Sequence, residues 1–270
     1  MSAGERDRYE GFALFLRLLL RLRAASEAGE ILTSLSSMRD PRQGAVYLGT
    51  LLAPLPPESI VSALDALLDA AGRKEPGADV AVQAILSPLL RRGWRQGLSL
   101  QVQGVAREEG RFDLAAMLLE LPEMDERFIP PPAPVPKELK DVPLGLRKAW
   151  ARRPDIDMME RLLSDPDPAV IANLLDNPRL TVREVVRLAS ERKAGEEILE
   201  AIALHPRWIA RYEVKVTLAH NPSTPVRITL GLLRLIMSQD LEVLAEDSRL
   251  SGVVTGRIRR MLAERSALPS

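Results

Sequence analysis

The sequence predicts an all-α protein with an N-terminal helical, bundle-like domain, a proline-rich linker and a C-terminal α-solenoid of about three helical hairpins. The composition is 46% apolar but only 4% aromatic, and Ala and Leu dominate it, which suits the packing of helix on helix. Apolar residues recur at helical spacing in both halves, and a short proline-containing pattern returns in the second half. The expected limits of the three parts are residues 1–122, 123–143 and 144–270.

The first expected helix covers residues 6–28. Its main apolar stripe contains Phe12, Phe15, Leu19 and Leu22. Arg17 interrupts an apolar run that is too short to span a bilayer, so no transmembrane segment is expected. Three alternatives stay open for this helix: burial in the N-terminal domain, self-association, or contact with a membrane surface through its Leu/Phe face.

The other helices of the N-terminal domain are expected at residues 43–53, 58–72, 78–92, 99–109 and 112–121. Short turns would join them, as in a compact bundle or in irregular helical repeats. Six prolines then follow between residues 130 and 143. This density excludes regular helix and predicts an extended, semi-rigid linker, with a proline-rich ligand as the alternative.

A turn pattern recurs in the second half of the chain. Asn177 and Asn221 each precede a proline and are 44 residues apart, and a weaker copy places Asp247 at the same point. A second set of breaks, at Pro166 and Pro206, is 40 residues apart. Two interleaved breaks at this period predict helical hairpins, with one break between hairpins and one within each.

The residues after these breaks predict helix starts. Thr181, followed three residues later by Glu184, is typical of a capping box. Thr224 is expected to cap the next helix, with Pro225 at its first position, where a missing N–H costs nothing. Ser251 is the corresponding hydroxyl residue of the third, weakened unit.

These motifs resemble a known class. The stretches "LLSDPDPAVIANLLDNPRLTVREVVRLA" and "HPRWIARYEVKVTLAHNPSTPVRITLGLLRLI" are similar to the bacterial HEAT-like, or armadillo-type, helical repeat proteins with Asp-Pro, Asn-Pro and Thr-Pro at their breaks. The resemblance covers about residues 144–264. It implies an α-solenoid that binds proteins, or less often nucleic acid, and it implies no catalytic residues.

An aromatic and basic stretch, "PRWIARYEVK", is the first candidate binding surface. Trp208 and Tyr212 are four residues apart and are expected on one helix face, beside a basic stripe of Arg207, Arg211 and Lys215. Aromatic rings beside arginine are typical of protein interface hot spots and of nucleic-acid stacking sites. The alternative is that Trp208 packs between hairpins while its basic neighbours are solvated.

The second candidate surface follows from the repeat register. Arg183 and Arg227 lie at equal offsets from the Asn of their units, and Arg234 and Arg260 share another offset; Arg187, one turn after Arg183, belongs to the same candidate surface. Equivalent positions of stacked repeats are expected to lie above one another, so these arginines would line an inner groove that attracts an acidic peptide or phosphates. Alternatively, these arginines are only solvated residues on the surface of the array and bind no partner.

Other polar residues are assigned to structure. His205 and His220 both fall at breaks, where the neighbouring units carry various polar residues, so solvent exposure is expected rather than metal binding. An acidic cluster in the third quarter of the chain contains Asp155, Asp157, Asp165 and Asp167. Helix caps and turns beside proline explain this cluster better than a cation site does.

The remaining features disfavour catalysis. Formal net charge is zero, which gives no global attraction to nucleic acid, and there is no Cys for thiolate chemistry or zinc. Phosphate loops, nucleophile elbows and zincin motifs are absent from the sequence. The sequence therefore predicts a cytoplasmic, non-enzymatic scaffold without cofactor or metal that binds a protein partner. The alternative is a nucleic-acid-binding HEAT-like protein, DNA processing included, that uses the arginine rows with Trp208 or Tyr212.

Overall fold

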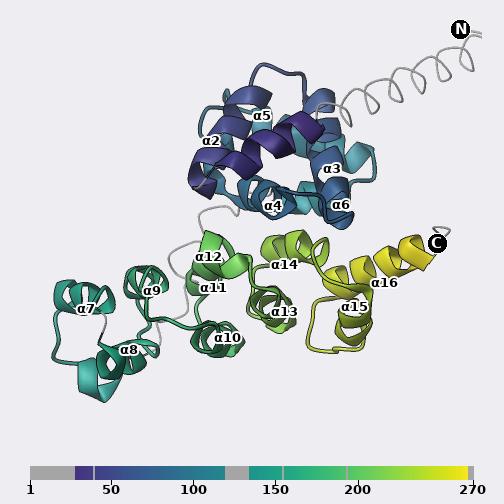
Figure 1. Ribbon diagram of the computed structural model, residues 1–270. Helices are drawn as coiled ribbons and strands as arrows, with labels where there is room; N and C mark the ends of the chain where they lie inside the picture. The colour runs from purple at the N-terminus through teal and green to yellow at the C-terminus, as the bar shows by residue number, and fades with distance from the viewer. Residues whose placement is uncertain (1–27, 39, 119–133, 154, 193, 267–270) are drawn as a thin grey trace, which may run out of the picture. The chain divides into compact units, whose positions relative to one another are not determined.

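The computed structural model describes residues 28–38, 40–118, 134–153, 155–192 and 194–266 (Figure 1). These residues form helices and turns, and no strand occurs among them, which confirms the predicted all-α class. The chain divides into two compact units, unit 1 (Met1–Leu118) and unit 2 (Leu119–Ser270). Residues 6–27 of the first predicted helix and residues 123–133 of the predicted linker lie outside the described residues.

The helices of unit 1 follow the predicted order closely. After a helical stretch at residues 28–37 they are α2 (Pro41–Leu52), α3 (Pro57–Gly72), α4 (Ala78–Leu86), the 3-10 helix η1 (Pro88–Arg91), α5 (Leu98–Glu108) and α6 (Phe112–Met117). The element expected at 78–92 is divided at Ser87, because Pro88 cannot donate a hydrogen bond to the preceding turn. The helical stretch at 28–37 was not predicted; it buries Ala28, Ile31, Leu32 and Leu35 at helical spacing.

One glycine allows two elements of unit 1 to approach closely. α2 packs against α4 and η1, and at Gly49 a Cβ atom would lie 2.0 Å from the backbone oxygen of Leu90. The indole Nε1–H of Trp94 donates a hydrogen bond of 3.1 Å to the Gly49 oxygen. Any larger residue at position 49 would separate α2 from η1.

The first element of unit 2 among the described residues is the 3-10 helix η3 (Lys137–Leu139), in which Leu139 is buried. The end of the predicted linker is therefore folded. The helices that follow are α7 (Leu144–Ala151), α8 (Ile156–Leu162), α9 (Pro168–Leu175), α10 (Val182–Ser190), α11 (Glu196–Ala203), α12 (Pro206–Ile209), α13 (Tyr212–His220), α14 (Val226–Leu233), α15 (Ser238–Ala245) and α16 (Gly252–Ser266).

The helices of unit 2 lie in two rows (Figure 1). In one row α7 packs against α9, α9 against α11, and α14 against α16; in the other, α10 packs against α13 and α13 against α15. Successive helices of the chain generally alternate between the rows, and α12 is a single turn beside α11. The helices of these pairs also pack against helices of the opposite row, for example α13 against α14 and α15 against α16.

The predicted helix starts are confirmed in two of the three expected repeats of unit 2. Thr181 and Glu184 form the capping box, with the Thr181 hydroxyl accepting from the Glu184 N–H. Ser251 Oγ accepts from the N–H of Val254. In the second repeat the prediction was wrong. Pro225 is the N-cap of α14, and the buried Thr224 hydroxyl donates a hydrogen bond of 2.7 Å to the oxygen of Leu218. Thr224 therefore closes the end of α13 instead of starting α14.

The asparagines of the repeated turn have a role beyond breaking a helix. The Asn177 side-chain amide donates to the backbone oxygens of Ala151 and Arg153, each at 2.8 Å, at the end of α7. Its Oδ1 accepts from the N–H two residues later, at 3.0 Å. Asn177 is 1% exposed. Its side chain thus binds the end of the helix that α9 packs against, and it pairs carbonyls that a helix end leaves free.

Asn221 makes the same contacts in the other row. Its amide donates to the oxygens of Ala189 at 2.8 Å and Glu191 at 3.1 Å, at the end of α10, and its Oδ1 accepts from Ser223 N–H at 3.0 Å. In the third repeat Asp247 Oδ1 accepts a hydrogen bond from the N–H two residues later, also at 3.0 Å. A carboxylate has no N–H to donate, so Asp247 cannot bind a helix end in this way.

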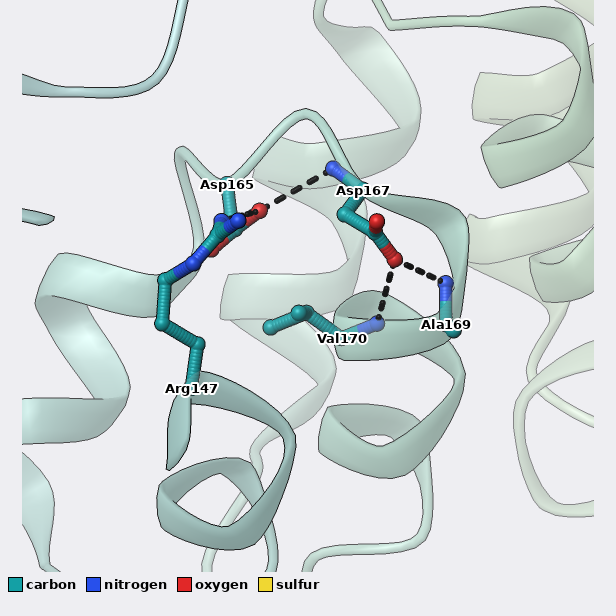
Figure 2. A network of polar contacts seen from close by, with 5 residues as sticks. All are labelled: Arg147, Asp165, Asp167, Ala169 and Val170. Atoms are coloured by element: carbon teal, nitrogen blue, oxygen red, sulfur yellow. Dashed lines mark hydrogen bonds and ion pairs between the residues drawn. The ribbon is translucent and has the colours of Figure 1, made fainter. Parts of the chain in front are cut away.

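Three of the four residues of the acidic cluster, Asp155, Asp165 and Asp167, form caps and turns, as predicted; Figure 2 shows Asp165 and Asp167. Asp155 caps α8 through Met158 N–H, and Asp167 caps α9 through the N–H groups of residues 169 and 170. Asp165 accepts from the N–H of Asp167 and from Arg147 Nη1, at 2.6 and 2.5 Å to its two oxygens. Arg147 and Asp165 are both buried, so this ion pair fixes the α8–α9 turn on α7.

None of the helices in the described part of the chain combines the length and the apolar character that crossing a membrane requires.

Candidate functional site

The predicted aromatic pair is separated by a helix break. Trp208 lies in the single-turn helix α12 and Tyr212 begins α13, because Arg211 between them adopts an extended conformation (φ −84°, ψ 123°). The two rings therefore do not share a helix face. This corrects the expectation from their four-residue spacing, which assumed one continuous helix.

Trp208 is a structural residue. It is 1% exposed, and its Nε1–H donates 2.8 Å to the oxygen of Leu175 at the end of α9. The Arg207 guanidinium lies 4.2 Å from the Trp208 ring centroid and donates, at 3.0 Å each, to the oxygens of Asn177 and Leu180. The burial of Trp208 agrees with the alternative that it packs between hairpins, and α12 thereby binds the α9–α10 turn. The other part of that alternative, solvated basic neighbours, does not hold for Lys215, which is buried.

Tyr212 links α13 to the start of α15. Its hydroxyl donates to the Asp240 carboxylate and accepts from the N–H of Met237 at 3.1 Å. Burial, and then the hydrogen bond to Asp240, raises the pKa of the Tyr212 phenol above its ordinary value. Lys215, the third expected member of the basic stripe, is buried, so no continuous basic stripe forms on α13.

The expected register of Arg183 above Arg227 is not found. Between Asn177 and Asn221 the chain forms three longer helices as well as α12, so the second asparagine falls in the opposite row. Arg183 is carried by α10, which packs against α13, whereas Arg227 is carried by α14, which packs against α16. Arg227 also forms an ion pair with Glu200 at 2.5 Å. These two arginines do not line one groove.

The two arginines of the other expected pair, Arg234 and Arg260, lie on helices of the same row. Arg234 is the C-cap of α14 and is half-buried, while Arg260 is exposed on α16. A further arginine of α16, Arg265, donates to the oxygen of Ile236, just after α14, at 2.9 Å. Burial, and then the charge of Arg234, lowers the pKa of Arg265.

Four arginines of the candidate set are exposed and form no ion pair or side-chain hydrogen bond within the described part of the chain, and two of them lie on α10. Arg183 and Arg187 are one turn apart and exposed, and neither forms an ion pair with any residue that the structure describes. Arg211, at the start of α13, is exposed as well. Because α10 packs against α13, these three arginines of the candidate set lie on neighbouring helices. Arg260, on α16, is the fourth exposed arginine, so four of the nine candidate residues remain available and three of these lie on α10 and α13.

Both histidines pair with an aspartate of a neighbouring turn. His205 Nε2 lies 3.2 Å from Asp176 Oδ1, and His220 Nδ1 lies 3.6 Å from Asp247 Oδ2. Arg249 also bonds Asp247, and its hydrogen bonds hold the pKa of that carboxyl well below its usual range. Within the described ranges no three acidic or histidine side chains converge as a metal ion would require.

Sequence reasoning missed the residues that join the turns, above all Asn177, Asn221 and Arg147. The signal available for the asparagines was their recurrence before proline, but that pattern does not reveal a partner 24 to 32 residues earlier. Comparisons of the chain with protein-family models, with curated proteins and with solved structures found no match.

Proposed function

We propose that this protein is a cytoplasmic, non-enzymatic scaffold and that its C-terminal unit is a HEAT-like α-solenoid that binds an acidic surface of a protein partner. The main support is the pair Arg183 and Arg187 on α10, which are exposed and have no ion pair among the described residues. Arg207 and Arg227, by contrast, are engaged by backbone oxygens and by Glu200. Exposed, unpaired guanidinium groups one turn apart suit carboxylates of a partner.

The arrangement of the helices supports the solenoid part of the proposal. Helices of unit 2 pack on neighbours within two rows, and the turns carry equivalent asparagines that bind backbone oxygens of a preceding helix. Repeat arrays are built from such nearest-neighbour contacts and present one long surface to a partner.

A protein is the proposed partner rather than a nucleic acid. The nucleic-acid alternative needs aromatic rings that stack on bases beside the arginines. Trp208 is buried and the hydroxyl of Tyr212 is bonded to Asp240, so neither ring is free for that role. A gel shift over a salt series examines the alternative directly, because phosphate contacts weaken steeply as salt rises.

The experiment uses affinity capture by the full chain from its native lysate, with proteins quantified by mass spectrometry. Arg183→Glu/Arg187→Glu is compared with Arg161→Glu, which changes an exposed arginine of α8. We expect one protein to be enriched by the wild type and by Arg161→Glu but lost with the double variant. Equal enrichment of the partner by the wild type, Arg161→Glu and the double variant would refute the assignment of the binding surface to α10. A salt-sensitive gel shift of nucleic acid would favour the nucleic-acid-binding alternative.

A further inference from the structure

Unit 1 carries a shallow groove between α2 and η1. It has a volume of about 500 Å³ and is lined by Met38, Arg42, Gln43, Val46, Tyr47, Leu89 and Arg92. Residues 42–47 belong to α2, Leu89 belongs to η1, and Arg92 is the C-cap of η1. Its walls are therefore α2 on one side and η1 on the other, with Met38 following the helical stretch at 28–37.

The walls of this groove are held at a fixed separation. One turn after Val46, Gly49 brings α2 against the backbone of Leu90, with room for no Cβ atom. Trp94 then ties the two walls through its hydrogen bond to the Gly49 oxygen. A groove whose walls cannot move apart is already formed before a ligand arrives, which reduces the entropy lost on binding.

The side chains of the groove combine apolar surface with positive charge. Met38, Val46, Tyr47 and Leu89 supply the apolar part, and Val46 is 45% exposed. Arg42 and Arg92 are both exposed, come from opposite walls, and form no ion pair with any residue that the structure describes. No carboxylate is among the lining residues. Apolar surface between two unpaired guanidinium groups suits an apolar side chain flanked by carboxylates.

We propose that this groove binds a short peptide segment of a partner protein, in which an apolar side chain contacts Val46, Tyr47 and Leu89 and neighbouring carboxylates pair with Arg42 and Arg92. Peptide binding in the groove does not depend on α10. The protein would thus have one interaction surface on each unit.

The test is selection of peptides from a random phage-displayed library on the full-length chain. We expect enriched sequences in which Asp or Glu flanks an apolar residue. A synthetic peptide of the enriched sequence should bind Arg42→Glu/Arg92→Glu at least about tenfold more weakly than wild type. The matched control is Arg107→Glu, an exposed arginine of α5 whose charge reversal should leave the affinity unchanged.

Several results would overturn the proposal. They are the absence of any enriched family, enrichment of sequences without acidic residues, and equal binding by wild type and the double variant. A dimer in sedimentation that the double variant dissociates would instead assign the groove to a second copy. Thermal melting of each variant shows that it is folded, and Arg42→Gln/Arg92→Gln, which adds no negative charge, should also weaken binding. Arg183→Glu/Arg187→Glu should bind the peptide like wild type, which separates this test from that of the proposed function.

Discussion

Asn177 and Asn221 make the same three side-chain hydrogen bonds although they belong to different rows of unit 2. Each amide donates to two backbone oxygens, two residues apart, at the end of a preceding helix, and each Oδ1 accepts from the N–H two positions later. Both side chains are buried. The repeated turn is therefore a tether between helices as well as a break within the chain.

Asn221→Asp should destabilise unit 2 strongly. The substitution keeps the acceptor for Ser223 but replaces two donated hydrogen bonds with a buried carboxylate facing the oxygens of Ala189 and Glu191. We expect a loss of about 2–4 kcal/mol in the free energy of unfolding, measured by urea denaturation. Gln239→Glu, the same chemical change at an exposed site, should stay within about 0.5 kcal/mol of wild type. Similar losses in both variants would show that the amide does not tether the helices.

Trp208→Phe should remove one hydrogen bond while keeping a six-membered aromatic ring in the site. The oxygen of Leu175 would lose its partner in a buried place, and the Arg207 guanidinium would lie over a weaker π-system. We expect a cost of about 1–3 kcal/mol, measured by chemical denaturation. The control is Trp150→Phe, because the described residues offer no hydrogen-bond partner to the Trp150 indole; an equal cost there would contradict the role assigned to Nε1.

Gly49→Ala should destabilise unit 1 although alanine favours helices. A Cβ atom would lie 2.0 Å from the Leu90 oxygen, so η1 must move and the Trp94 hydrogen bond must lengthen. The expected loss is at least about 2 kcal/mol in the free energy of unfolding. Gly104→Ala in α5, where a Cβ meets nothing within 4 Å, should instead stabilise the protein by about 0.5–1 kcal/mol. Thermal denaturation of the pair should give changes of opposite sign.

Arg249→Met should reduce the sensitivity of the protein to acid. Arg249 lowers the pKa of Asp247 in the folded state below its ordinary value of 3.8, so the folded carboxyl releases its proton more readily than the unfolded one. The stabilisation from this pair is present above pH 3.8 and is lost as pH falls through the lower folded pKa.

Urea denaturation over a pH series measures this effect. Wild type and Arg259→Met, a change of an exposed arginine on the following helix α16, should lose stability in parallel below pH 3.8. Arg249→Met should start less stable near neutral pH and lose less on acidification. Parallel curves for all three proteins would rule out the linkage.

Local patterns predicted local structure well. Thr181 followed three residues later by Glu184 correctly predicted the capping box. The aspartates and prolines between residues 154 and 168 correctly indicated the turns that bound α8 and precede α9. Residues 28–37 were missed because their Ser and Thr residues favour turns, and burial of Ile31 and Leu35 in the tertiary core overrides that preference.

Long-range features depend on helix count and on contacts that sequence spacing does not encode. The single turn of α12 places Trp208 against α9 and ends before Tyr212, which invalidated the predicted aromatic face. Three longer helices between Asn177 and Asn221 put the second asparagine in the opposite row, which invalidated the alignment of Arg183 with Arg227. The groove between α2 and η1 was also beyond sequence reasoning, because it depends on the close approach at Gly49.

The asparagine amides bind main-chain oxygens only, and every helix end supplies such oxygens whatever its side chains. A duplicated or inserted hairpin would therefore find its docking partner without any matching substitution in the unit before it. Such an attachment places no demand on the side chains of the neighbouring helix, so those side chains can change while the contact is kept.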